Sequence, residues 1–204
     1  MHIHVENIAK KFSSQHYIFR NLNFDLYKNH VYGISGANGA GKTTLLSLLS
    51  GNQIPTKGKI EYLLTSDKVV PNLLWYKYFT YAAPYADLYE YLTVFEMTKF
   101  FKQMKGFANH ISVNDVLEIA MLSDKSTEFT KNLSSGMKQR FKLALTIMSN
   151  SEVLLLDEPT TNLDLKTQDW FKKLLEKWKA NRIVVIASND PQDFELTDSI
   201  ISLN

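Results

Sequence analysis

The 204-residue chain contains no cysteine. This absence excludes disulfide bonds, thiolate nucleophiles and cysteine-ligated zinc, and it fits a protein that works in a reducing compartment. Any bound metal must therefore be held by oxygen or imidazole ligands. The five histidines show no spacing typical of a metal site, so we interpret them as surface or packing residues. They are His2, His4, His16, His30 and His110.

The chain also lacks an excess of charge and a long apolar run. Its 23 basic and 21 acidic residues nearly cancel, without the basic footprint of a nucleic-acid binder, so we expect no nucleic-acid partner. The apolar runs Val153–Leu156 and Ile183–Ala187 are too short to span a bilayer, and the first residues lack the features of a secretory signal. We therefore expect a soluble protein without direct membrane insertion, whose membrane role would depend on a partner.

The first part of the chain has the pattern of a β-rich flank followed by a strand, a loop and a helix. Leu22, Phe24 and Leu26 alternate with polar residues, which is typical of an antiparallel strand with one buried face. A short strand is predicted at 31–35, and a leucine-rich helix at 42–50 is ended by a glycine.

The rest of the chain predicts a helical lobe followed by a return to the sheet. Capping-box spacing favours a mostly helical stretch over about 93–150. Two apolar strands at 152–156 and 182–187, separated by an amphipathic helix, form a βαβ unit. We predict one α/β domain with a mainly parallel sheet, in which the lobe is inserted between 1–92 and 151–204.

The segment Gly36–Thr43 reads Gly-Ala-Asn-Gly-Ala-Gly-Lys-Thr and has the spacing of a phosphate-binding loop. Its glycines let the backbone curl until N–H groups point at phosphate oxygens. Lys42 would neutralise the phosphates of ATP, and Thr43 would offer its hydroxyl to Mg²⁺. A chance glycine turn is the alternative, and the flanking strand and helix favour a P-loop NTPase core instead. The predicted nucleotide-binding residues of this segment are Gly36, Ala37, Asn38, Gly39, Ala40, Gly41, Lys42, Thr43 and Thr44.

Two adjacent carboxylates end the apolar strand that begins at Val153. The carboxyl edge of a parallel sheet is where ligands bind in such folds, so Asp157 is expected beside the nucleotide as a Mg²⁺ ligand. Glu158 points differently and suits the general base that orients the attacking water. An acidic helix cap explains this pair equally well when the pair is considered alone, and the phosphate loop favours the catalytic interpretation.

The segment Leu133–Arg140 reads Leu-Ser-Ser-Gly-Met-Lys-Gln-Arg and resembles the Leu-Ser-Gly-Gly-Gln signature of ATP-binding cassette (ABC) proteins. The resemblance extends over nearly the whole chain. It implies that Phe12 stacks on adenine, that Leu88–Glu96 leads into the helical lobe, and that Pro159–Asp164 is the loop after the catalytic glutamate.

The same resemblance implies a head-to-tail pair of cassettes, with a homodimer as the expected form. In such a pair Ser134, Ser135 and Gly136 of one copy would reach the γ-phosphate held by the other copy. A hydroxyl and exposed N–H groups at a helix start can bind an anion. An ordinary helix start remains the alternative, because Ser135 replaces the usual first glycine.

Two departures from the family pattern bear on activity. Pro84 lies where the family carries a glutamine that touches Mg²⁺, and Asn189 lies where it carries a histidine. A neutral asparagine bonds the γ-phosphate more weakly than a charged histidine would, so we expect Lys42, Glu158 and Asn189 to support slow hydrolysis.

Three functions remain to be compared. The first is the ATPase subunit of an ABC transporter, closest in wording to exporters, bound to separate permease subunits on the cytoplasmic face of the membrane. Seven of the ten tyrosines lie between Tyr62 and Tyr91, where a permease helix could dock or where the rings could simply pack. The second is a degenerate module that binds ATP as a regulatory switch. The third, a soluble cassette acting on DNA or ribosomes, is disfavoured because the chain has no room for a second cassette or a long coiled coil.

Overall fold

The computed structural model describes residues 1–12, 16–64, 68–108 and 110–203. The chain forms two compact units. Unit 1 comprises Met1–Tyr81, Glu152–Glu158 and Lys179–Asn204, and unit 2 comprises Ala82–Ser151 and Pro159–Trp178.

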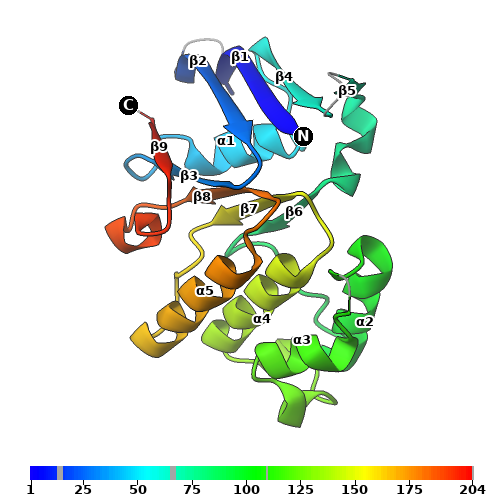
Figure 1. Cartoon of the computed structure of the whole chain (residues 1–204). Helices are drawn as coiled ribbons and strands as arrows, with labels where there is room; N and C mark the ends of the chain where they lie inside the picture. Colours follow the sequence, from blue (N-terminus) through cyan, green and yellow to red (C-terminus); the bar gives the residue numbers. More distant parts are fainter. Residues whose placement is uncertain (13–15, 65–67, 109, 204) are drawn as a thin grey trace. The chain divides into compact units, whose positions relative to one another are not determined.

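Unit 1 contains an antiparallel sheet that confirms the predicted β-rich flank (Figure 1). Its strands are β1 (His2–Lys11), β2 (Tyr17–Tyr27), β4 (Lys57–Leu63) and β5 (Val69–Val70), arranged in the order β2-β1-β4-β5. Leu26 is fully buried while Asn21 and Asn23 are exposed, so the alternation in the sequence does correspond to one buried face.

The second sheet has the strand order β6-β7-β8-β3-β9. Its strands are β3 (His30–Ser35), β6 (Phe79–Ala82), β7 (Val153–Asp157), β8 (Ile183–Ala187) and β9 (Ser199–Ser202). β3 pairs in parallel with β8 and β9, and β7 pairs in parallel with β8. Every residue of β7 and β8 is buried, which explains why both strands read as unbroken apolar runs. The carboxyl ends of β3, β7 and β8 meet at one edge, and this is the edge that carries the candidate site.

Helix α1 (Lys42–Leu49) directly follows the loop after β3. Leu45, Leu46, Leu48 and Leu49 are each 0–1% exposed and belong to one apolar cluster that also includes residues of β1, β2, β7 and β8. Packing on both sides therefore holds the start of α1 rigidly against the strand edge.

Unit 2 is mainly helical. It contains α2 (Val94–Lys105), α3 (Val113–Ile119), α4 (Ser135–Met148) and α5 (Leu165–Trp178), with short 3₁₀ turns at Ser123–Lys125 and Thr130–Asn132. Both predicted capping boxes are present, since Thr93 pairs with Glu96 and Ser112 with Asp115 at the starts of α2 and α3. The predicted lobe at 93–150 lies within unit 2, which also contains α5. That division into functional parts stays a prediction.

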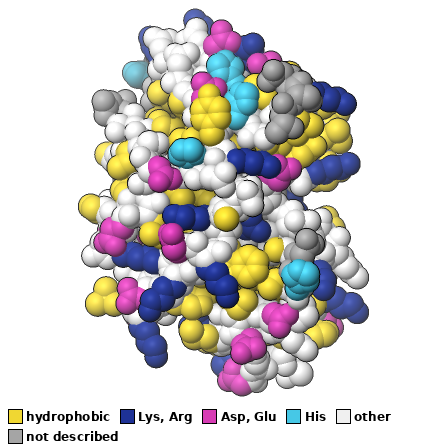
Figure 2. Space-filling model, viewed as in Figure 1, with side chains coloured by type: hydrophobic (Ala, Val, Ile, Leu, Met, Phe, Trp, Pro, Cys, Tyr) yellow, Lys and Arg dark blue, Asp and Glu magenta, His cyan; other side chains and the backbone are white. Residues whose placement is uncertain are grey.

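The surface charge and the length of the helices are relevant to the expected nucleic-acid and membrane partners. On the face drawn in Figure 2, lysine and arginine side chains are interspersed with acidic and apolar ones. Among the residues that the structure describes, no helix combines the length and the apolar character needed to cross a bilayer.

Candidate functional site

The phosphate loop joins β3 to α1 and depends on its glycines. Gly39 and Gly41 have φ angles of 84° and 100°, a region that residues with a Cβ rarely adopt. A Cβ at Gly41 would also overlap Ile18, and one at Gly36 would lie 2.9 Å from the Leu203 carbonyl oxygen. No side chain caps the start of α1, so its first-turn N–H groups are available to an anion.

Lys42 is held inside the loop that it follows. Its side chain is only 7% exposed, and its Nζ donates a 2.8 Å hydrogen bond to the Gly36 carbonyl oxygen. Glu158 Oε1 lies 3.7 Å from the same nitrogen. A buried ammonium attracts a phosphate group strongly, and the nearby carboxylate offsets part of that charge while no phosphate is bound.

Asp157, at the end of β7, is 2% exposed. Its Oδ2 accepts hydrogen bonds from Thr43 Oγ1 at 2.7 Å and from the Tyr81 hydroxyl at 3.1 Å. Burial raises the pKa of this carboxyl, and the two hydrogen bonds oppose the shift. Its other oxygen, Oδ1, is buried and has no hydrogen-bond partner within the described part of the chain.

This arrangement fits Mg²⁺ on two counts. A buried carboxylate oxygen without a donor, such as Oδ1, is stabilised by a cation, and the Thr43 hydroxyl contacts the other oxygen of the same carboxylate, Oδ2. Among the described residues there is no group of three or more His, Cys, Asp or Glu side chains that could hold a metal. One carboxylate suits Mg²⁺, which usually completes its shell with substrate phosphates and water.

Glu158 has a left-handed backbone, with φ of 44°. Its N–H donates a 2.7 Å hydrogen bond to the Ala187 carbonyl oxygen at the end of β8. Its Oε2 accepts from Ser188 Oγ at 3.1 Å and faces the Asn189 N–H at 3.5 Å. A non-glycine residue in this conformation costs on the order of 1 kcal/mol, and such strain is concentrated at functional sites.

Asn189 lies next to the phosphate loop. Its side-chain amide donates a 3.0 Å hydrogen bond to Asn38 Oδ1, in the middle of the loop. The structure therefore brings the candidate residues of unit 1 together at one sheet edge: the loop residues, Thr44 at the start of α1, Asp157, Glu158 and Asn189.

Phe12 is the remaining candidate in unit 1. Its ring is 69% exposed, and Lys10 Nζ lies 5.3 Å from the ring centroid. An exposed aromatic ring is available for stacking, and its contact with adenine stays a prediction.

The segment that resembles the ABC signature lies in unit 2. Ser134 caps α4, and its Oγ accepts a 3.3 Å hydrogen bond from the Met137 N–H. Ser134 and Ser135 are exposed, and Gly136 lies in the first turn. A Cβ at Gly136 would lie 3.1 Å from the Asn162 carbonyl oxygen, so a side chain there would disturb the loop after Glu158.

Comparison with known proteins identifies the family. The sequence profile described as ABC transporter matches residues 19–161. The chain belongs to the ABC transporter family. ATP-binding cassette sub-family A member 9 of Mus musculus is 31% identical over 193 residues, which are 91% of this chain and 12% of that protein. Phospholipid-transporting ATPase ABCA3 of Homo sapiens is 28% identical over 204 residues, which are 98% of this chain and 12% of that protein.

The chain thus spans a small part of these ABC relatives. Among solved structures, a dimeric post-hydrolysis state of an ATP-binding cassette bound to ADP and Pi matches with a TM-score of 0.82 and 22% identity, over 99% of this chain and 94% of that one. This likeness and the family match confirm both the resemblance and the predicted α/β P-loop fold.

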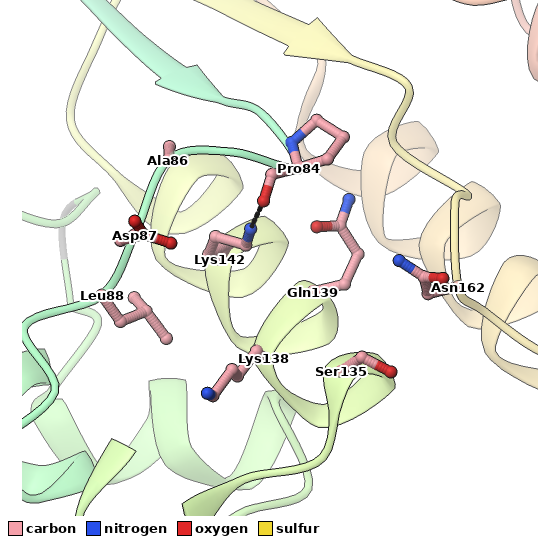
Figure 3. A pocket seen from close by; sticks show the side chains of 9 residues that line it. All are labelled: Pro84, Ala86, Asp87, Leu88, Ser135, Lys138, Gln139, Lys142 and Asn162. Atoms are coloured by element: carbon pink, nitrogen blue, oxygen red, sulfur yellow. Dashed lines mark hydrogen bonds between the residues drawn. The ribbon is translucent and has the colours of Figure 1, made fainter. Parts of the chain in front are cut away.

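The departure from the ABC pattern at Pro84 lies beside a small pocket in unit 2 (Figure 3). Lys142 of α4 points towards the Pro84 segment, and its Nζ donates to the carbonyl oxygens of Ala83 and Pro84 at 2.9 and 2.8 Å. Gln139 Nε2 donates to the Pro159 carbonyl oxygen at 2.9 Å. The cavity of about 120 Å³ is lined by Pro84, Ala86, Asp87, Leu88, Ser135, Lys138, Gln139, Lys142 and Asn162.

Sequence reasoning missed three polar side chains of these sites: Tyr81, Lys142 and Ser188. Tyr81 lies in the tyrosine-rich stretch Tyr62–Tyr91, but nothing in the sequence indicated that its hydroxyl would contact Asp157. Lys142 had none, because a lysine in a helix is usually solvated and its two carbonyl partners are about 60 residues away in the chain.

Proposed function

We propose that the chain is the ATP-binding and ATP-hydrolysing part of an ABC transporter. The observation that carries the proposal is the convergence of Lys42, Asp157, Glu158 and Asn189 on the phosphate loop at one edge of the parallel sheet. Family membership supports it independently.

The chain's own residues suit the steps of hydrolysis. The loop N–H groups and Lys42 bind the β- and γ-phosphates, and Thr43 and Asp157 would hold Mg²⁺, which neutralises developing phosphate charge. Glu158 orients a water and takes its proton as the water oxygen bonds to the γ-phosphorus and the bond to the β-phosphate oxygen breaks. Asn189 donates a neutral hydrogen bond to the γ-phosphate, so we expect slower turnover than a histidine would give.

The site is proposed to be completed by a second copy, in the head-to-tail arrangement that the family resemblance implies. Ser134, Ser135 and Gly136 of that copy would face the γ-phosphate, and the exposure of Ser134 and Ser135 at the start of α4 supports this role. One matched solved cassette is itself described as dimeric.

Transport is proposed to run through separate membrane subunits, with the chain attached to the cytoplasmic face. Tyr85, Tyr89 and Tyr91 are 91%, 61% and 75% exposed, so these rings are available to a partner. Substituting Tyr85 and Tyr89 with alanine should preserve ATP binding and reduce membrane association; a grossly unfolded variant would instead favour a packing role.

The second candidate is a regulatory module that binds ATP with little hydrolysis. Pro84 and Asn189 favour it, because Pro84 replaces a glutamine expected at Mg²⁺ and Asn189 replaces a histidine expected at the γ-phosphate. Turnover of the purified protein with Mg²⁺ decides between the two, alongside Glu158→Gln. A rate that the substitution reduces at least 100-fold supports the ATPase, whereas equal rates in the two proteins would contradict the role of Glu158 and favour the regulatory module.

A further inference from the structure

Tyr81 lies near the end of β6, the strand that leads into the Pro84 segment. Its ring is half-buried, and its hydroxyl donates to Asp157 Oδ2 at 3.1 Å. Asp157 is the proposed metal ligand, so Tyr81 acts directly on the group that would hold Mg²⁺. The role assigned to Tyr81 therefore rests on the proposed function.

The two oxygens of Asp157 have different surroundings. Oδ2 accepts both donors, the hydroxyls of Thr43 and Tyr81, while Oδ1 accepts none from the described residues. A carboxylate rotates about its χ2 torsion with a broad energy profile. Two donors from different elements, α1 and β6, restrict that torsion and leave Oδ1 as the oxygen without a protein donor.

The Tyr81 donor is also independent of the metal. The Thr43 hydroxyl is expected to give a lone pair to Mg²⁺, while the phenol has no such second role. Pro84, three residues further on, has no side-chain donor or acceptor.

We propose that Tyr81 is a positioning residue for the metal site: it holds the Asp157 carboxylate in the orientation in which that group would bind Mg²⁺. In this chain, a phenol from β6 supplies a polar contact to the metal-binding group. Mutating a residue that hydrogen-bonds to a metal ligand typically lowers metal affinity by about 10- to 100-fold.

Tyr81→Phe tests this role because it removes only the phenol oxygen. Tyr62→Phe is the matched control, since the Tyr62 hydroxyl also makes a buried hydrogen bond in unit 1, but its partner is the Leu49 carbonyl oxygen at 2.9 Å instead of Asp157. Mn²⁺ is the probe, and its binding to the full chain with a non-hydrolysable ATP analogue is followed by electron paramagnetic resonance. Nucleotide binding without metal and thermal unfolding are measured for both variants.

We expect Tyr81→Phe to weaken Mn²⁺ binding about tenfold, with nucleotide binding in EDTA unchanged, and Tyr62→Phe to leave both unchanged. The inference is overturned if Tyr81→Phe binds Mn²⁺ as the wild type does, or if it loses metal-free nucleotide binding by the same factor. Asp157→Asn distinguishes a failure of the proposed metal site from a failure of the positioning role of Tyr81. Intact Mn²⁺ binding in Asp157→Asn would contradict the proposed metal site itself, while loss in Asp157→Asn alone would remove only the role of Tyr81.

Discussion

The phosphate-loop edge of unit 1 and the start of α4 in unit 2 are built in opposite ways. At the loop edge, Lys42 and Asp157 are almost completely buried and are held by several hydrogen bonds. At the start of α4, Ser134 and Ser135 are exposed, and Ser134 Oγ accepts one long bond from its own helix. A buried, hydrogen-bonded constellation is organised within one chain, whereas an exposed helix start gains a ligand only from another molecule.

The largest effect is expected at the loop edge. Glu158→Gln keeps the size and the Ser188 contact but removes the base, so phosphate release should fall at least about 100-fold. ATP affinity should change little, because Lys42 and the loop amides remain. Parallel assays of phosphate release and equilibrium ATP binding check this, and a joint loss of both would show that Glu158 serves to build the site.

A mixing experiment tests whether the start of α4 in one copy completes the nucleotide site of the other copy. Lys42→Ala disables the loop and Gly136→Asp places negative charge at α4, so each variant alone should be inactive. A head-to-tail heterodimer of the two keeps one complete site, and an equal mixture should recover about a quarter of the wild-type rate. No recovery, in a mixture that gel filtration shows to form dimers, would mean that α4 does not act across the dimer.

Unit 2 also contains a partly buried hydrogen-bond cluster, in which Lys142 donates to the carbonyl oxygens of Ala83 and Pro84. Lys142→Met leaves the Ala83 and Pro84 carbonyl oxygens without their donor and should lower the free energy of unfolding by about 1–3 kcal/mol. Lys138→Met, one turn earlier on α4, is the control and should change it by less than about 0.5 kcal/mol. Urea unfolding measures the free energy of unfolding of both variants. Equal losses would mean that the Lys142 hydrogen bonds to the Ala83 and Pro84 carbonyl oxygens add no specific stability.

The smallest effect concerns stability at Asp157. Because burial raises the pKa of this carboxyl above the ordinary value of 3.8, the folded protein binds the proton more tightly than the unfolded chain does. Its favourable contribution is therefore present at low pH and is lost as pH rises through the folded pKa. Asp157→Asn should then raise the Tm slightly at pH 7, with the difference shrinking towards pH 3.8. A lower Tm at pH 7 would show that the carboxylate's hydrogen bonds outweigh its burial.

The sequence was sufficient to predict the local features of the fold. Leucines at helical spacing after Gly41, the capping boxes at Thr93 and Ser112, and the apolar run of β7 all correspond to the observed elements. Each depends on neighbours within a few residues, which is the range over which periodicity and capping act. The loop itself could be recognised because its glycine spacing is set by backbone geometry.

The sequence by itself therefore determined the α/β class, and it predicted the phosphate loop, the acidic pair and the departures at Pro84 and Asn189. Only the tertiary structure decided that the Tyr81 hydroxyl meets Asp157, that Ser188 orients Glu158, and that Lys142 binds the Pro84 segment. These partners come from elements that are far apart in the chain and become neighbours through strand order and helix packing. Short-range pattern carries no information about such contacts.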